Sequence, residues 1–343
     1  MNETVCAPLA AWALDRLLGD PPNAWHPVAW QGRFLAWAED RSQRPEGQKS
    51  GGRGQSRDRE AGAPDAGLAA GDLGRFAWGA AALAAGMALS AGAAWGASRL
   101  ARRLPWPFRL ALEAGLLKLA IASRGLDRAA GEVEDALRRG DLGEARRLLS
   151  WHLVSRDTSD LSAEEVAGAA VESVAENLTD AFVAPLCAYF AGGLPAVWAY
   201  RFAQTADSMW GYHDEAHEWL GKPAARLDDA LNWLPARLAA GLLAVATWLV
   251  EGRAAARRAW RTRRDQARRT ASPNAGQTMA TMAGALGVTL TKRGHYVLAG
   301  GDAALTADTL ARGRRIVRMA AGLAVLAATI VALSTKSAHG RRE

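Results

Sequence analysis

The chain has 343 residues, 50% of them hydrophobic and 22% charged, with a net charge of +7 and a mean hydropathy of −0.10. That average hides residues 76–98, which are 23 consecutive positions without a charge and would form about 34 Å of helix, enough to cross a bilayer. The composition therefore argues against a single soluble domain. The two cysteines, Cys6 and Cys187, lie far apart in apolar stretches and argue against a disulfide framework or a thiolate zinc site.

Apolar segments divide the chain into three parts. We expect a membrane-associated N-terminal segment over 1–40, a disordered polar linker over 41–75, and a helical membrane catalytic domain over 76–343. The linker is rich in Gly, Arg, Ser and Pro and has too few large apolar side chains to form a core. The candidate membrane segments are 5–18, which is the weakest because it is short, then 76–98, 178–200, 230–250 and 316–335.

The stretches between these segments predict cytoplasmic helical insertions. Residues 127–150 have the apolar spacing of amphipathic helices broken at Gly140. Eight arginines between Arg253 and Arg269 follow an apolar segment, as expected of a juxtamembrane cytoplasmic loop. No aromatic stacking platform accompanies them, which argues against nucleic acid as a partner. We predict an all-α, polytopic helical integral membrane protein, multi-pass in the cell membrane.

An acidic stripe marks the helix expected to start at Ser162, where Ser162 and Glu165 form a capping-box pattern. Glu172 and Glu176 share one face with Glu165, and Asp180 continues that face one turn later. A solvated helix face is the ordinary explanation of such a stripe. The small apolar residues around it instead indicate close packing, so we expect the carboxylates to bind a cation or to form an ion-pair network with Arg156, Arg201 and Arg237.

A second polar set follows between residues 201 and 237. Asp228 and Asn232 lie four residues apart, a spacing that lets a carboxylate and an amide address one hard cation such as Mg²⁺. The alternative is that Asp228 or Asp229 caps the helix leading into 230–250. Ser272-Pro-Asn274 is a tight-turn sequence that could direct backbone N–H groups at an anion, although such a turn is also ordinary.

Six motifs in the chain, in this order, match those of a known family: LDRLLGDPPNAWHP (14–27), SRDTS (155–159), AVESVAENLTD (170–180), DSMWGY (207–212), ARLDDALNWLPAR (225–237) and SPNAGQTMATMAGAL (272–286). Together they resemble the adenosylcobinamide-phosphate synthase family of cobalamin biosynthesis, known as CobD or CbiB. The chain departs from what we expect of the family in its longer, more polar 41–75 stretch and in having Thr270 and Ala271 where a histidine is expected nearby.

The resemblance implies a membrane amide ligase that uses ATP and Mg²⁺ to join (R)-1-aminopropan-2-yl phosphate, or free aminopropanol, to a propionate carboxylate of adenosylcobyric acid. The partners it implies are this corrinoid, the amine, the lipid bilayer and other membrane enzymes of cobalamin assembly. Within this reading, the residues assigned as catalytic are Glu172, Glu176 and Asp207, and those assigned to Mg²⁺ are Asp207, Asp228 and Asp229. Those assigned to substrate or phosphate are Arg156, Asp157, Asn177, Arg201, Asn232, Arg237, Ser272 and Asn274.

Membrane topology is the open question. If each apolar segment crosses once, 99–177 and 251–315 lie on one side and the acidic 201–229 stretch on the other, so cytoplasmic ATP would not reach both. A break at Gly192, Gly193 and Pro195 could turn 178–200 into a re-entrant hairpin, but this would place the Ser272 loop outside unless 230–250 also fails to span. The competing function is a corrinoid-binding or corrinoid-transporting membrane protein, which uses broken helices and buried charges equally well.

Overall fold

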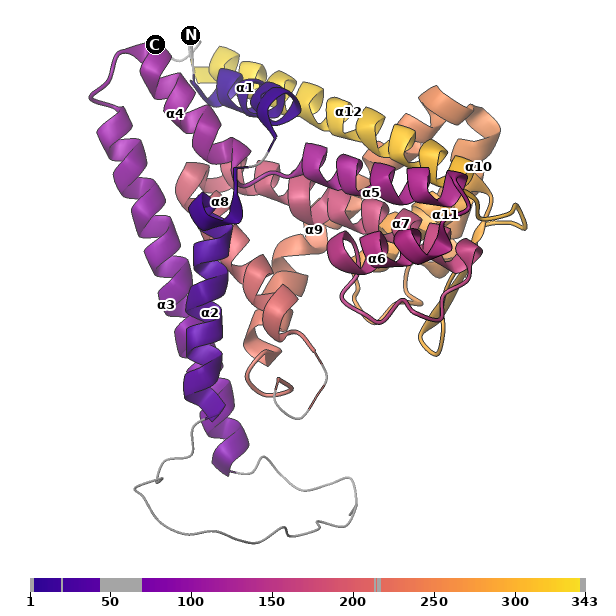
Figure 1. Cartoon of the computed structure of the whole chain (residues 1–343). Helices are drawn as coiled ribbons and strands as arrows, with labels where there is room; N and C mark the ends of the chain where they lie inside the picture. The colour runs from indigo at the N-terminus through magenta and orange to yellow at the C-terminus, as the bar shows by residue number, and fades with distance from the viewer. Residues whose placement is uncertain (1–2, 20, 44–69, 213, 215–216, 340–343) are drawn as a thin grey trace, which may run out of the picture.

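The protein consists almost entirely of helices in the computed structural model, which describes residues 3–19, 21–43, 70–212, 214 and 217–339 (Figure 1). A short antiparallel hairpin of β1 (Thr289–Lys292) and β2 (Tyr296–Ala299), which the sequence analysis missed, lies between the last two helices. The helices are α1 (Glu3–Leu18), the 3₁₀ turn η1 (Asn23–Trp25), α2 (Pro27–Gln43), α3 (Ala70–Ala101), α4 (Trp106–Lys118), α5 (Ser123–Arg138), α6 (Leu142–His152), α7 (Ala163–Leu178), the π-helical turn η2 (Thr179–Val183), α8 (Ala184–Trp210), α9 (Lys222–Glu251), α10 (Arg253–Gln266), α11 (Ala275–Leu286) and α12 (Ala307–His339).

Four stretches of helix are long and apolar enough to cross a membrane, which confirms an all-α membrane protein. Segment 5–18 is not among them, because α1 is short and buries Ala7 and Ala11 completely against the core. Residues 44–69 of the predicted linker lie outside the described residues. The predicted bounds of the linker, 41 and 75, were wrong, because residues 41–43 form the end of α2 and residues 70–75 form the start of α3. The four stretches are Gly71–Ala101, Ala163–Trp210, Lys222–Glu251 and Ala307–Ser334.

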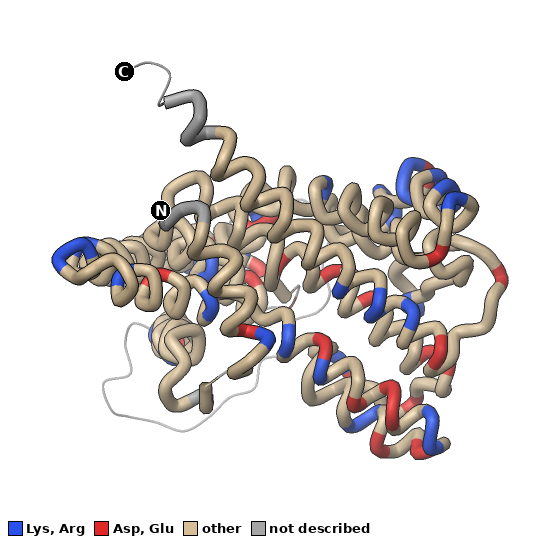
Figure 2. The backbone as a smooth tube through the Cα atoms, turned by 90° about the horizontal axis from the view of Figure 1, so that it is seen from above, with Lys and Arg blue, Asp and Glu red and all other residues tan. Residues whose placement is uncertain are grey.

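The amphipathic insertion is confirmed as α5 and α6, which break at Gly140. These helices carry many of the charged residues, whereas long stretches of the chain elsewhere carry none (Figure 2). Their apolar faces, including Val133 and Leu149, are fully buried against the rest of the core.

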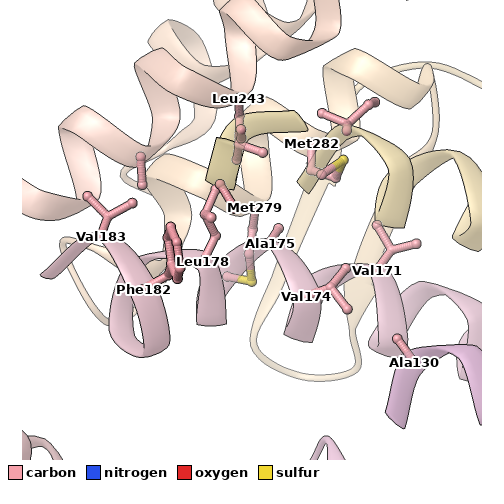
Figure 3. Close-up of a cluster of buried hydrophobic side chains, with 14 of the residues drawn as sticks. Ala130, Val171, Val174, Ala175, Leu178, Phe182, Val183, Leu243, Met279 and Met282 are labelled. Carbon is pink, nitrogen blue, oxygen red and sulfur yellow. The ribbon is translucent and has the colours of Figure 1, made fainter. Parts of the chain in front are cut away.

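The centre of the core is α7, whose small residues let neighbouring helices approach closely (Figure 3). Val174 and Leu178 of α7 pack with Leu243 of α9 and Met282 of α11 in one buried cluster. This packing holds α7 rigidly, and with it the acidic residues that α7 carries.

The segment 178–200 is a helical hairpin and not a straight span. Gly192 and Gly193 leave the helical conformation in the middle of α8, and Gly193 has a φ of +65°, which an L-residue rarely adopts. The chain reverses there, so that the Tyr200 hydroxyl and Arg201 Nη1 each lie 3.3 Å from the carbonyl oxygen of Asp180. The structure therefore contains the hairpin that the re-entrant alternative requires, in place of the straight helix assumed by the single-crossing count.

A second reversal occurs after α9. Gly252, with a φ of +88°, ends α9, and α10 returns beside it and packs against α11. Eight arginines follow Gly252 and were expected to form a juxtamembrane loop, but most of them belong to α10, whose Ala255 and Ala259 are buried. After α10 the chain comes back to the N-terminal part of α9. The hydroxyl of Ser272 lies there, 3.1 Å from Asp229 Oδ1. The 201–229 stretch and the Ser272 loop therefore lie on the same side of the molecule.

Candidate active site

Helix α7 positions the first acidic residues. Its N-terminus carries the predicted capping box, in which Ser162 and Glu165 exchange hydrogen bonds with each other's backbone N–H groups. Glu165 then pairs with Arg293 at the surface, with Nη2 to Oε2 at 2.6 Å. Two and three turns further on, Glu172 is only 6% exposed and Glu176 lines a cavity. One helix face therefore runs from a surface ion pair to buried carboxylates, and a solvated stripe is wrong for its second half.

The α8 hairpin brings Asp207 beside Asp180. Tyr200 and Arg201 anchor the returning arm on the backbone of Asp180, and Asp207 follows nearly two turns later. The backbone N–H of Gly211 donates to the carbonyl of Asp207 over 2.7 Å and ends the helix just past this residue. Asp180 and Asp207 line the same cavity although 27 residues separate them in the chain.

Helix α9 adds Asp228, Asp229 and Asn232. Asn232 is 2% exposed, accepts a hydrogen bond from the Tyr200 hydroxyl over 3.0 Å, and donates to Asp228 Oδ2 over 2.9 Å. The other oxygen, Asp228 Oδ1, is buried and has no hydrogen-bond partner. The capping alternative for Asp228 and Asp229 was wrong, because α9 begins six residues before Asp228, at Lys222.

The Ser272–Asn274 loop closes the site from the other side. Ser272 donates to Asp229 Oδ1, and Asn274 Nδ2 donates to the carbonyl of Asp229 over 2.8 Å. The chain packs tightly directly after this loop. A Cβ at Gly276, in the first turn of α11, would come within 2.2 Å of the carbonyl oxygen of Ala267. On the other face of the loop, Asn274 Oδ1 accepts a hydrogen bond from Arg237 Nη1 over 3.4 Å. The loop is therefore fixed between a carboxylate and a guanidinium.

These four elements enclose a cavity of about 320 Å³ whose lining is dominated by carboxylates. Like charges so close together repel one another strongly in a partly buried site. Among the described residues, no group of three or more His, Cys, Asp or Glu is spaced to hold a metal ion by itself. A cation bound here would need further oxygen ligands from another molecule. The lining residues are Glu176, Thr179, Asp180, Asp207, Gly211, Ala225, Asp228, Asp229, Asn232, Ala271, Ser272, Asn274 and Ala275.

Behind this cavity, the β-hairpin places Tyr296 next to α7. Burial and the negative charges of Glu172 and Glu176 raise the pKa of Tyr296 well above its ordinary value, so the phenol stays protonated. Arg156 acts electrostatically on both Glu172 and Tyr296, and Lys292 acts on Glu172 and Glu176. The sequence analysis missed Tyr296 and Lys292 because each sits on a strand of only four residues.

A family model described as CobD/Cbib protein matches residues 8–326, which include every site residue named above. This chain belongs to the CobD/CbiB family. Its relatives include cobalamin biosynthesis protein CbiB of Salmonella typhi, 35% identical over 333 residues and covering 94% of this chain and 95% of the relative. Cobalamin biosynthesis protein CobD of Chromobacterium violaceum is 40% identical, covering 86% and 84%, and that of Dehalococcoides mccartyi is 39% identical, covering 84% and 85%. No solved structure matches the chain.

In this member of the CobD/CbiB family, six of the predicted site residues do not line the cavity. Arg201 and Arg237 hydrogen-bond to residues that line it, and Glu172 and Arg156 form a neighbouring group, whereas Asp157 and Asn177 lie away from it. Asp157 is exposed and accepts hydrogen bonds from the backbone N–H and the hydroxyl of Ser159, and both of them lower the pKa of Asp157. Asn177 donates to the carbonyl of Ser173 and lines a separate small cavity between α1, α5, α7 and α12. Asp180, Tyr200 and Thr179, which sequence reasoning did not assign, stand in the site instead.

The donor set of the cavity fits a hard divalent cation. Mg²⁺ prefers carboxylate oxygens and usually binds through one or two of them, with water and substrate phosphates completing its shell. The unpartnered oxygen of Asp228 supplies such a ligand, and Asp229 lies next to it on α9. Without a bound cation, the carboxylates of the cavity face one another, and their mutual repulsion lowers the stability of the fold.

Proposed function

We propose that this member of the CobD/CbiB family is an ATP-dependent amide ligase. The reaction attaches (R)-1-aminopropan-2-yl phosphate, or aminopropanol, to a propionate carboxylate of adenosylcobyric acid and gives adenosylcobinamide phosphate. The observation that carries the proposal is the carboxylate-lined cavity, which is closed by a serine-asparagine loop and has an arginine beside that loop. Oxygen ligands for a cation and donors for an anion therefore meet in one place.

The chemistry of amide formation requires both kinds of group. A propionate oxygen attacks the γ-phosphorus of ATP, the bond to the bridging oxygen breaks, and ADP leaves. The amine then attacks the acyl carbon, the bond from that carbon to the phosphate oxygen breaks, and phosphate leaves with the electron pair. The nitrogen, which enters as an ammonium group, gives up two protons in all and keeps one as the amide N–H. Phosphoryl transfer of this kind depends on positioning and on cations around the developing charge.

Under this proposal, each side chain has one task. Of Asp207, Asp228 and Asp229, the carboxylates assigned to Mg²⁺, one or two would bind the ion directly, and water and substrate phosphate would complete its shell. The ion would neutralise phosphate charge and orient the phosphoryl group. Asn232 fixes the orientation of Asp228 through the hydrogen bond to Oδ2. Glu176 lines the cavity and is suited to accept the proton of the ammonium, while Glu172 lies one turn behind it.

The cationic and amide groups would face the phosphates. Arg237, Ser272 and Asn274 lie together at the edge of the cavity, and Arg201 donates to the carbonyl of Asp180, which lines it. Arg156 belongs to the neighbouring Glu172 group. Asp157 and Asn177 face elsewhere and have no task in the proposed reaction.

A reconstitution experiment tests this function. The purified protein in liposomes is incubated with adenosylcobyric acid, aminopropanol phosphate, ATP and Mg²⁺, and corrinoid mass and ADP are measured together. We expect amide product and ADP in equal amounts, and neither when Mg²⁺ is replaced by a chelator. Free aminopropanol in a parallel reaction identifies the amine. Corrinoid that is bound or moved across the bilayer without ATP-dependent mass change would instead favour the corrinoid-binding or transporting function.

We also propose the cell membrane as the location, with other membrane enzymes of cobalamin assembly as neighbours. Four apolar stretches support a membrane location. Fractionation of cells that produce the protein, with extraction of the membranes at high salt and at alkaline pH, tests it. The protein should remain in the membrane pellet, and release by salt alone would contradict the proposal.

A further inference from the structure

Three arginines gather on the far side of the Ser272–Asn274 loop from the carboxylates. Arg237 comes from α9, Arg263 from α10, and Arg268 from the turn that follows α10, and the last two act electrostatically on the first. The salt bridges among the described residues involve other arginines. None of Arg237, Arg263 and Arg268 pairs with an aspartate or a glutamate of the described chain. Three like charges therefore stand together without a counter-ion from the described chain.

Neutral groups hold two of these guanidinium groups in place. Arg237 lies over the ring of Trp233 at 4.1 Å and donates to the carbonyl of that residue over 2.6 Å. Arg263 lies over Trp260 at 4.9 Å, and its Nε donates to Oε1 of Gln277, which is 8% exposed. Burial lowers the pKa of Arg263. Since aromatic faces and amides fix the cations but do not neutralise them, their remaining N–H donors stay available to an anion.

Arg237 and the carboxylate cavity share one loop. Arg237 and Asp229 lie eight residues apart on α9, about 12 Å along the helix, and Asn274 hydrogen-bonds to both. Helix α11 begins directly after Asn274, so its positive end also faces this region. A molecule carrying phosphate could therefore reach the arginines while a cation on it meets the carboxylates.

We propose that Arg237, Arg263 and Arg268 form a binding site for the phosphate groups of a substrate. The identity of that substrate rests on the proposed function, which supplies two sources, the polyphosphate of a nucleoside triphosphate and the phosphate ester of the amino alcohol. Guanidinium groups bind phosphate through paired N–H donors, which lysine does not provide. Part of the arginine-rich stretch thus serves ligand binding instead of contact with the membrane surface.

Ligand binding without turnover tests the proposal. The purified full chain in detergent is titrated with a fluorescent ATP analogue, which is then displaced separately by ATPγS and by aminopropanol phosphate. The variants are Arg263→Gln and Arg268→Gln, with Arg264→Gln as the matched control, because Arg264 is exposed and pairs with Asp265 at 2.9 Å. We expect the first two to weaken binding of one ligand at least about tenfold and the control less than twofold.

The ligand that is weakened names the source of the phosphate. Arg263→Lys, which keeps the charge, and a melting curve for every variant separate a folding defect from lost binding, and Arg268 is exposed enough that its replacement should leave folding intact. The proposal would be overturned if Arg263→Gln and Arg268→Gln bound both ligands as tightly as the control Arg264→Gln does. Arginine-dependent binding without amide product would overturn the proposed function but leave the phosphate site standing.

Discussion

Two groups of half-buried or buried acidic residues in this protein are built in opposite ways. At the junction of α5 and α12, Asp127 Oδ1 pairs with Arg314 at 3.1 Å and Arg318 at 2.9 Å, and Glu134, 4% exposed, pairs with Arg138 and Arg314. In the cavity, five carboxylates lie together and Asp228 keeps one buried oxygen without a partner. A buried charge with a complete set of counter-charges is typical of structure, whereas uncompensated charges gathered in a cavity indicate a binding site.

The largest expected effect is on activity. Asp228→Asn keeps the shape of the side chain and the hydrogen bond to Asn232 but removes the charge that would hold the cation. Amide formation in the reconstituted assay should fall about 100- to 1,000-fold. The melting temperature should not fall, because one of several repelling charges has gone. Turnover near that of the original chain would remove Asp228 from the mechanism.

The acidic group that pairs with arginines, at the junction of α5 and α12, should show the opposite result, a loss of stability without a loss of activity. Glu134→Gln leaves Arg138 and Arg314 facing a neutral amide. Because Arg138 is 45% exposed and keeps Asp308, and Arg314 keeps Asp127, the loss should cost about 2 kcal/mol of folding free energy. We expect a clearly lower melting temperature in detergent, with normal activity per folded molecule at low temperature. An unchanged melting temperature would show that the α5–α12 ion pairs are dispensable.

Ligand binding gives a smaller and more specific test. Mg²⁺ with ATPγS at ten times the dissociation constant should stabilise the folded chain by about 1.4 kcal/mol, because only the folded cavity binds them. The same addition should raise the melting temperature of Glu134→Gln but not that of Asp228→Asn. Equal stabilisation of both variants would place the cation elsewhere.

The difference between the two groups also marks the limit of sequence-based prediction. The uncharged run of α3, the break at Gly140 and the capping box at Ser162 depend on neighbouring residues, and all three were predicted. The acidic residues of the site were recognised through helical spacing and family motifs. Their assignment to one site came from the family resemblance, because residue spacing alone could not bring them together. Their meeting depends on two reversals of the chain, at Gly193 and Gly252, and only the first was raised as an alternative.

Long-range pairing explains the remaining errors. Asp180 meets Tyr200, and Asp229 meets Ser272 across 43 residues, and neither contact leaves a periodic signal in the sequence. Tyr296 sits on a four-residue strand, too short for alternation to be recognised. The topology problem had the same origin, since counting straight crossings cannot represent a helix that turns back on itself.

The smallest expected effect concerns Glu165, which belongs to the same acidic stripe as Glu176 but ends at the surface. Its partner Arg293 has a side chain that is 66% exposed, so the pair is screened by solvent and contributes about 0.5 kcal/mol or less. Glu165→Gln can keep the capping hydrogen bond to Ser162 and should change both the melting temperature and the turnover very little. Glu176→Gln, three turns along the same face, is the matched comparison and should abolish product formation. If both variants lost activity equally, the division of α7 into a structural and a catalytic half would be wrong.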